Sequence, residues 1–295
     1  MYLCCNIKKF LRLLLTDAAV FAICGLVFFV GRKVFRSSAT SEEESPVPLP
    51  VIMYHSVWDT SPSEYVVTPE QLDSDLKWLR DNGYSSVSAE ELIRYTHGQG
   101  ALPDKPVLIT FDDGHYNNLS DALPVFEKYD MCFIVSVVGS YTDSLAPADP
   151  HCSAYSYLTW EDISALLSSG RAEIGNHTYA MHSNSAGRKG CARMNGESEE
   201  DYRSALRDDL TLLQTESAAE LGYSPFIFAY PFGLISRESV PVLRDMGFLI
   251  TLTCYERMNY ISRDPDCLFG LDRFNRSGLL STEEYMTRMT KDIEA

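Results

Sequence analysis

Two short segments carry the side chains that could do chemistry in this chain. Thr110-Phe111-Asp112-Asp113-Gly114 holds two adjacent carboxylates, and His177-Thr178-Tyr179-Ala180-Met181-His182 holds two imidazoles. Zn²⁺ accepts carboxylate oxygens and imidazole nitrogens, and a catalytic zinc site uses three protein groups and a water molecule. The fourth group is then free to act as a base. Together the two segments predict metal-assisted hydrolysis.

Neither segment is specific when it is taken alone. Asp-Asp-Gly also forms ordinary turns, and two histidines five residues apart on a helix point ~140° away from each other. The histidines therefore require a non-helical backbone, which Gly175 and Asn176 just before His177 favour. The alternative is a turn and two unrelated polar loop residues. The conjunction is more specific, because the segments follow strand-like runs at 107–111 and 172–174.

The elements that must position these side chains alternate between strands and helices. Strand-like apolar runs fall at 51–54, 107–111, 131–138, 172–174, 226–230 and 248–252. Helical patterns begin at Thr68 and at Ser88 and recur near 119–129, 160–169, 199–221 and 237–246. This alternation predicts an α/β fold of parallel strands with covering helices, in the form of a closed or slightly distorted (β/α) barrel. In such a barrel the functional groups gather at the C-terminal ends of strands, where both segments lie.

At these residues the chain resembles a known family. The two segments are similar to the first two motifs of the polysaccharide deacetylases, carbohydrate esterase family 4, whose fold is the NodB homology domain. The resemblance runs from about Val51 to the C-terminus. It implies that Asp112 is the catalytic base and that Asp113, His177 and His182 hold a divalent metal, Zn²⁺ before Co²⁺, Ni²⁺ or Mn²⁺. The five-residue histidine spacing resembles a sub-group that includes deacetylases of poly-N-acetylglucosamine.

The resemblance also assigns a third motif. Phe228-Ala229-Tyr230-Pro231-Phe232-Gly233 is similar to the family segment in which an aromatic residue's backbone N–H helps to bind the oxyanion, a role that carries to Phe232. Ala229 stands where the family commonly has the arginine that orients the base. Arg273, at the end of the last strand-like run, is the candidate replacement. The alternative for Arg273 is a surface salt bridge.

His55 is the candidate general acid. The family's usual last motif supplies a histidine that protonates the leaving amine, but no histidine follows His182. Val51-Ile52-Met53-Tyr54-His55 resembles that motif at the end of the first strand-like run, as in the sub-group whose motifs are circularly permuted. The first and last strands of a closed barrel are neighbours, so this permutation preserves the site. The alternative is a histidine that caps the strand end.

The composition fits one enzyme domain. The chain has 295 residues, is 45% hydrophobic and carries a net charge of −16. This charge excludes a nucleic-acid role but tolerates a neutral or cationic glycan. Beyond the N-terminal region the cysteines are odd in number, which argues against a complete disulfide framework and leaves one or two bridges open. They are Cys132, Cys152, Cys191, Cys254 and Cys267.

The N-terminal region predicts a membrane anchor. Basic residues flank an apolar run at 13–30 whose one charge is Asp17, and its length reaches the transmembrane threshold. A signal peptide cleaved near Ser37-Ser38-Ala39 is the alternative. The basic residues that directly follow the run suit an anchor better, and an outward-facing enzyme requires the N-terminus inside.

The expected organisation therefore has three parts. Residues 1–36 form a cytoplasmic tip and a single transmembrane helix in the cell membrane. Residues 37–50, rich in Ser, Glu and Pro, form a flexible linker. Residues 51–295 form an extracellular polysaccharide deacetylase domain.

These assignments predict a metal-dependent hydrolase that removes N-acetyl groups from an N-acetylglucosamine-containing polysaccharide of the cell surface or cell wall and releases acetate. An O-acetyl esterase acting on xylan-type glycans would use the same groups. A surface glycan-binding protein with a degenerate site is a further alternative, which the missing motif-three arginine favours. A purely structural metal would leave Asp112 without a role. The sequence does not identify the glycan, and no protein partner follows from it.

Overall fold

The computed structural model describes residues 45–144, 151–184 and 187–291. From Pro46 onward the chain forms one compact unit. Within the described ranges no helix is long and apolar enough to cross a membrane. The anchor expected at 13–30, and most of the linker expected at 37–50, lie outside the described residues.

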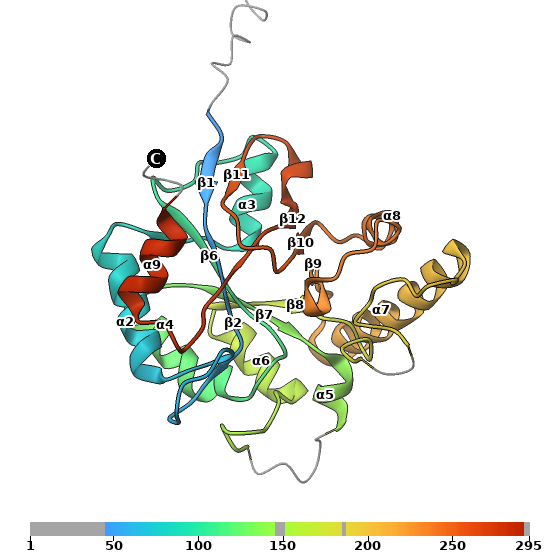
Figure 1. The fold of residues 1–295 in the computed structure, drawn as a ribbon, viewed down its shortest axis with the longest axis horizontal. Coiled ribbons are helices and arrows are strands. Elements are labelled where there is room, and N and C mark those ends of the chain that lie inside the picture. The colour runs from blue at the N-terminus through green and yellow to red at the C-terminus, as the bar shows by residue number, and fades with distance from the viewer. Residues whose placement is uncertain (1–44, 145–150, 185–186, 292–295) are drawn as a thin grey trace, which may run out of the picture. The chain divides into compact units, whose positions relative to one another are not determined.

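Eight parallel strands form one hydrogen-bonded path that curls into a distorted barrel (Figure 1). The path runs through β12 (Phe269–Leu271), β10 (Ile250–Leu252), β9 (Ile227–Ala229), β8 (Ala172–Asn176), β7 (Phe133–Val137), β6 (Pro106–Phe111), β2 (Val51–Tyr54) and β13 (Phe274–Asn275). β5 (Ser85–Ser86) pairs with β6 beside this path. No pairing joins β12 to β13 within the described residues, so the ladder is open between these edges. The expected parallel α/β arrangement is confirmed in its distorted form.

The last barrel strand in the sequence, β13, lies beside the first, β2. β13 pairs in parallel with β2, and Phe274 stands opposite Ile52. On its other side β2 pairs with β6, where Tyr54 stands opposite Phe111. A permuted motif order requires the first and last barrel strands in the sequence to be neighbours, and this pairing is present.

Helices follow most of the strands and surround the sheet (Figure 1). They are α2 (Pro69–Asp81), α3 (Ala89–Thr96), α4 (Leu123–Tyr129), α5 (Gly139–Ser144), α6 (Trp160–Ser168), α7 (Glu199–Leu221), α8 (Ser239–Asp245) and α9 (Thr282–Thr290). Capping boxes start α2, α3, α6 and α9, which fixes their first turns. The helix expected over 119–129 begins with a π-helical turn, Asn118–Ala122. Pro124, just after that turn, lacks the N–H that a regular α-helical bond would need.

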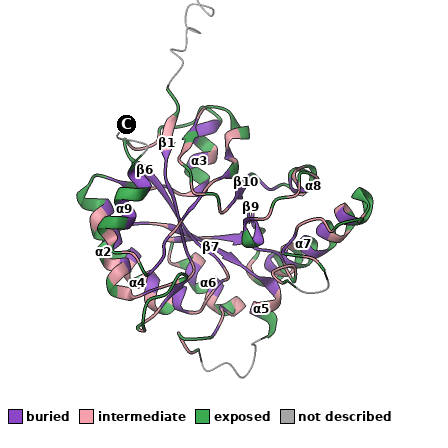
Figure 2. Ribbon diagram, viewed as in Figure 1, coloured by how far each residue is buried: buried purple, intermediate pink, exposed green. Residues whose placement is uncertain are grey.

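Alternating strand residues divide the core into an outer and an inner layer. Ile109, Val135 and Ile174 pack with residues of α2, α4 and α6. Leu108, Ile134 and their neighbours on β2, β9 and β10 fill the interior together with residues of α3. The strands are accordingly buried, whereas the outer faces of the helices are exposed (Figure 2). A rigid scaffold of this kind fixes the ends of its strands, where the site residues stand.

The compact domain begins earlier than expected. β1 (Val47–Leu49) pairs antiparallel with β11 (Asn259–Ile261), and Leu49 is buried. The expected boundary of the flexible linker at residue 50 is therefore wrong, since the compact unit starts at Pro46. Pro48 is tolerated because β1 is an edge strand, where a missing N–H need not break a ladder. All five cysteines of this domain are free.

Candidate active site

The C-terminal ends of the barrel strands surround a cavity of about 780 Å³. Six residues selected from the sequence line it: His55, Asp112, Asp113, His177, His182 and Phe232. The seventh, Arg273, lies behind the wall and is fully buried. The structure thus brings together side chains that are up to about 220 residues apart in the chain.

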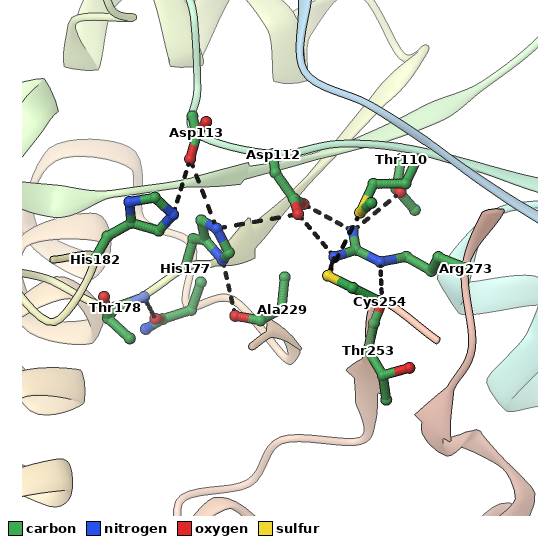
Figure 3. A network of polar contacts seen from close by, with 12 residues as sticks. Thr110, Asp112, Asp113, His177, Thr178, His182, Ala229, Thr253, Cys254 and Arg273 are labelled. Carbon is green, nitrogen blue, oxygen red and sulfur yellow. Dashed lines mark hydrogen bonds and ion pairs between the residues drawn. The ribbon is translucent and has the colours of Figure 1, made fainter. Parts of the chain in front are cut away.

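Three of these side chains form a cluster with the geometry of a metal site. The ligating atoms of Asp113, His177 and His182 all lie within 4.8 Å of one another. Asp113 Oδ1 is 3.7 Å from His177 Nε2 and 3.3 Å from His182 Nε2 (Figure 3). The backbone of Asp113 is left-handed, with φ 72°. This turn in the chain lets two adjacent carboxylates point to different partners.

Each imidazole is oriented through its other nitrogen. His177 Nδ1 donates to the Ala229 carbonyl at 2.8 Å, which leaves Nε2 free to face Asp113. His182 Nδ1 lies 3.3 Å from the Tyr141 hydroxyl, which also donates to the His182 carbonyl. Ring orientation through Nδ1 is the usual support of a metal-binding histidine. Burial, together with the charge of His177, lowers the pKa of His182 and so favours the neutral form that binds metal.

The cluster fits the metal that the sequence implies. Asp113 Oδ1 is buried and has no hydrogen-bond partner among the described residues. An unpartnered buried carboxylate oxygen is costly, yet two Nε2 atoms converge on this one. A divalent cation held by one carboxylate and two imidazoles would satisfy all three groups, and this donor set suits Zn²⁺.

Asp112, next to the cluster, is engaged by Arg273. Its two oxygens accept hydrogen bonds from Arg273 Nη1 and Nη2, both at 2.7 Å, and Arg273 Nε donates to the Thr253 carbonyl at 2.7 Å (Figure 3). Burial alone would raise the pKa of Asp112, but the charge and hydrogen bonds of Arg273, together with the nearby histidines, outweigh burial and hold that pKa well below its usual range. The surface salt bridge considered for Arg273 is wrong, because the side chain is fully buried.

His55 stands at the end of β2, on the wall of the same cavity. Its ring packs edge-on against Tyr65, with the centroids 4.8 Å apart, and its Nδ1 is buried without a partner among the described residues. Burial lowers the pKa of His55, although the charges of Asp112 and Asp113 oppose this effect.

Phe232 borders the metal cluster from the loop after β9. Its ring centroid lies 4.6 Å from that of His182, and its backbone is left-handed, with φ 57°. Gly233 follows with φ 65°, and a Cβ there would lie 2.6 Å from Cys254 Cβ. Only glycine permits this close approach, which brings the loop against the strand end that carries Cys254.

Other cavity residues had no motif to identify them. Met53, Trp58, Tyr65, His115, Lys189, Cys254 and Asn275 also line the cavity. Cys254 Sγ lies 3.7 Å from Arg273 Nη2, and His115 Nε2 lies 3.8 Å from Asp113 Oδ2. Tyr141, which orients His182, comes from α5. Its one signal in the sequence is its place soon after the apolar run of β7.

Comparison with known proteins gives consistent results. The family model of the polysaccharide deacetylases matches residues 99–250, just over half of the chain. YxkH of Bacillus subtilis (strain 168), whose name assigns it to the polysaccharide deacetylases, is 27% identical over 224 residues, 76% of this chain and 71% of that protein. The poly-beta-1,6-N-acetyl-D-glucosamine N-deacetylase of Escherichia coli (strain K12) is 24% identical over 217 residues, 67% of this chain. The chain spans only 32% of that protein's length.

Solved structures share the fold. The structure of IcaB from Ammonifex degensii superimposes with a TM-score of 0.67 at 25% identity. The superposition covers 83% of this chain and 97% of IcaB. The distorted barrel fold therefore recurs in that protein.

Proposed function

Since the chain belongs to the polysaccharide deacetylase family and is thus a hydrolase, we propose that it removes N-acetyl groups from poly-N-acetylglucosamine with the help of a divalent metal. The name of the Escherichia coli relative and the five-residue histidine spacing support this substrate class. One observation carries the proposal. The buried carboxylate of Asp112, which is paired with Arg273, lies beside the three candidate metal ligands and is not one of them.

The metal would be held by Asp113, His177 and His182, and it would supply an acidified water and Lewis-acid stabilisation of the acetamide oxygen. Asp112 accepts the proton of the attacking water. Arg273 keeps Asp112 ionised and fixes both of its oxygens, so the base needs no reorganisation. The Phe232 N–H donates to the developing oxyanion.

The leaving group requires a proton, which we assign to His55. Cleavage of the acetamide C–N bond leaves an amine nitrogen that must gain a proton as the bond breaks. His55 lies on the cavity wall with Asp112 and Asp113, and the charges of these two carboxylates oppose the lowering of the His55 pKa by burial. Asp112 and His55 thus act as base and acid in one turnover, and the products are acetate and a free amino sugar.

The alternative of a degenerate glycan-binding protein loses its main support. It was favoured by Ala229, which stands where the family commonly has an arginine. Arg273, from the other end of the domain, contacts the base through two hydrogen bonds. The aromatic side chains of Trp58, Tyr65 and Phe232 on the cavity wall suit the faces of sugar rings.

Acetate release from poly-N-acetylglucosamine tests the function directly. We expect activity in the zinc- or cobalt-loaded protein, none after chelation, and its return when either ion is added back. Asp112→Asn should lose at least about a thousandfold in kcat while still binding zinc. Full activity of Asp112→Asn, or activity that resists chelation, would refute the assignment. Faster release from acetylated xylan would instead support the O-acetyl esterase.

We further propose that residues 13–30 anchor the domain in the cell membrane with the catalytic domain outside. The apolar run and its flanking basic residues support this topology. A protease added to intact cells should then remove the domain, whereas a domain protected until the cells are lysed would contradict it.

A further inference from the structure

The loop between the two histidine ligands has a strained backbone. His177 directly follows β8, but His182 comes five residues later, after a non-helical segment. Thr178, the first residue of this loop, has φ 74°. A left-handed backbone is uncommon for a β-branched residue and costs of order 1–3 kcal/mol. Such a conformation persists only where its surroundings hold it.

A buried carboxylate from α7 holds this loop. Asp209 Oδ1 accepts the N–H of Tyr179 at 2.8 Å, and Asp209 Oδ2 accepts the N–H of Ala180 at 2.9 Å. Asp209 is 9% exposed, so these two bonds form largely out of water. Bonds between backbone N–H groups and an ionised carboxylate are stronger than those between neutral groups. Two successive residues of the ligand loop are therefore fixed from one side.

The opposite side of the loop is fixed by the start of α5. Gly139 N–H donates to the Thr178 carbonyl at 3.1 Å, and Ser140 N–H donates to the Tyr179 carbonyl at 2.8 Å. A Cβ at Gly139 would lie 2.4 Å from the Tyr179 ring, so the loop and α5 are in close contact. The loop is thus held between a helix start and the Asp209 carboxylate, and His182 follows it directly.

These contacts hold the loop that separates the two histidines. Since His177 is fixed by β8 and by Ala229, the position of His182 Nε2 relative to Asp113 Oδ1 depends on the loop and on Tyr141. We propose that Asp209 is a positioning residue that sets the path of the ligand loop and through it the affinity and geometry of the metal site. This inference rests on the proposed metal-dependent function and adds to it a residue of α7 that touches neither metal ligand side chains nor substrate.

The test uses Asp209→Asn in the full-length protein. The amide keeps the shape of the carboxylate, but its NH₂ group cannot accept the second N–H, so one loop N–H loses its partner. After removal of metal, zinc affinity is measured by competition with a chromophoric chelator, and the coordination geometry by the visible spectrum of bound Co²⁺. We expect affinity to fall about 10–100-fold, as for other residues that support metal ligands, together with a changed Co²⁺ spectrum.

Two further variants separate positioning from general stability. Asp208→Asn changes the exposed neighbouring carboxylate on α7 and should keep wild-type affinity and spectrum. Asp209→Glu keeps the charge but moves it by one methylene, and it should recover part of the affinity that Asp209→Asn loses. The unfolding midpoint of each metal-free variant is recorded in parallel, because a purely structural role would lower the midpoint and leave the Co²⁺ spectrum unchanged.

The outcomes distinguish the inference from the function on which it rests. Wild-type affinity and spectrum in Asp209→Asn would overturn the inference, whatever the unfolding midpoint. Should that variant not fold, Asp209→Glu decides alone, and an unaltered spectrum in it overturns the inference. If the wild-type protein itself binds neither zinc nor cobalt, the metal site is refuted and the inference is refuted with it.

Discussion

Two neighbouring aspartates show how the barrel assigns different chemistry to identical side chains. Asp112 directly follows β6, its N–H donates to the Tyr54 carbonyl of β2, and its side chain faces Arg273, which donates to both of its oxygens. Asp113 has φ 72° and faces His177 and His182. One carboxylate is therefore held ionised by a fixed cation, and the other offers a buried oxygen that a divalent ion would satisfy.

Replacing Arg273 should disable Asp112 without affecting substrate binding. In Arg273→Met the charge that lowers the pKa of Asp112 is lost while its burial remains, so that pKa should rise above its ordinary value of 3.8. The base also loses its orientation, and a displacement of about 1 Å costs on the order of a hundredfold in kcat. Acetate-release kinetics across pH should show this loss with KM unchanged. They should also show an acid limb at a higher pH than in the wild type.

Arg257 offers a matched control for this prediction. Arg257 Nε lies 2.9 Å from Asp272 Oδ2, but the Arg257 side chain is 69% exposed. An exposed pair contributes little, so Arg257→Met should keep the wild-type kcat and pH profile. Equal losses in both variants would contradict a specific role for Arg273.

The convergence of several motif residues at one end of the barrel could be predicted because they stand at the ends of local apolar runs. Asp112, His177 and His55 follow β6, β8 and β2, and the (β/α) pattern places such positions together. Tyr141 and Asp209 were not predicted. They lie within helices, and their function depends on distant contacts with the ligand loop. Helix periodicity shows that such residues face inward or outward, but not which backbone groups they contact.

At the level of elements, a second buried ion pair joins the ends of the domain. Arg276 donates to Asp75 on α2 through Nε at 2.7 Å and Nη2 at 3.1 Å, and both side chains are buried. Asp75 also accepts from the Tyr54 hydroxyl on β2 and from Thr282 at the start of α9. This network connects β2, α2 and α9 around β13, the strand that places Arg273 near Asp112.

Removing one member of this pair should be strongly destabilising. In Asp75→Asn the Arg276 guanidinium stays buried without a counter-charge, which costs about 3–5 kcal/mol. Urea unfolding of the metal-free protein should show this decrease in the free energy of unfolding. The double variant Asp75→Leu/Arg276→Met, which removes both charges, should recover a large part of it. Equal losses in the single and double variants would show that the charges themselves are not the cause.

At the level of the whole molecule, the permuted motif order is accommodated by the curvature of the sheet. β2 begins the barrel in sequence, but in space it lies between β6 and β13. His55 from the first strand therefore faces the same cavity as Asp112. The parallel α/β class and most element ranges followed from local periodicity. The pairing of β1 with β11 did not, because a segment rich in proline and glutamate has linker composition and its partner lies about 210 residues away.

The pH dependence of stability belongs to this scale, since it measures the folded molecule against the unfolded chain. Burial lowers the pKa of His55 from its model-peptide value of 6.5, so the folded protein binds this proton less readily than the unfolded chain does. The contribution of His55 to the free energy of unfolding is therefore fully present above pH 6.5. It is lost as the pH falls through the folded-state pKa. His55→Gln removes this linkage. When the pH is lowered from 7.5 to 5, the unfolding midpoint of metal-free His55→Gln should therefore fall less than that of the wild type. The midpoint of His97→Gln, which replaces an exposed histidine, should fall as much as that of the wild type. Parallel wild-type and His55→Gln curves across that range would mean that His55 is as readily protonated in the folded protein as in the unfolded chain.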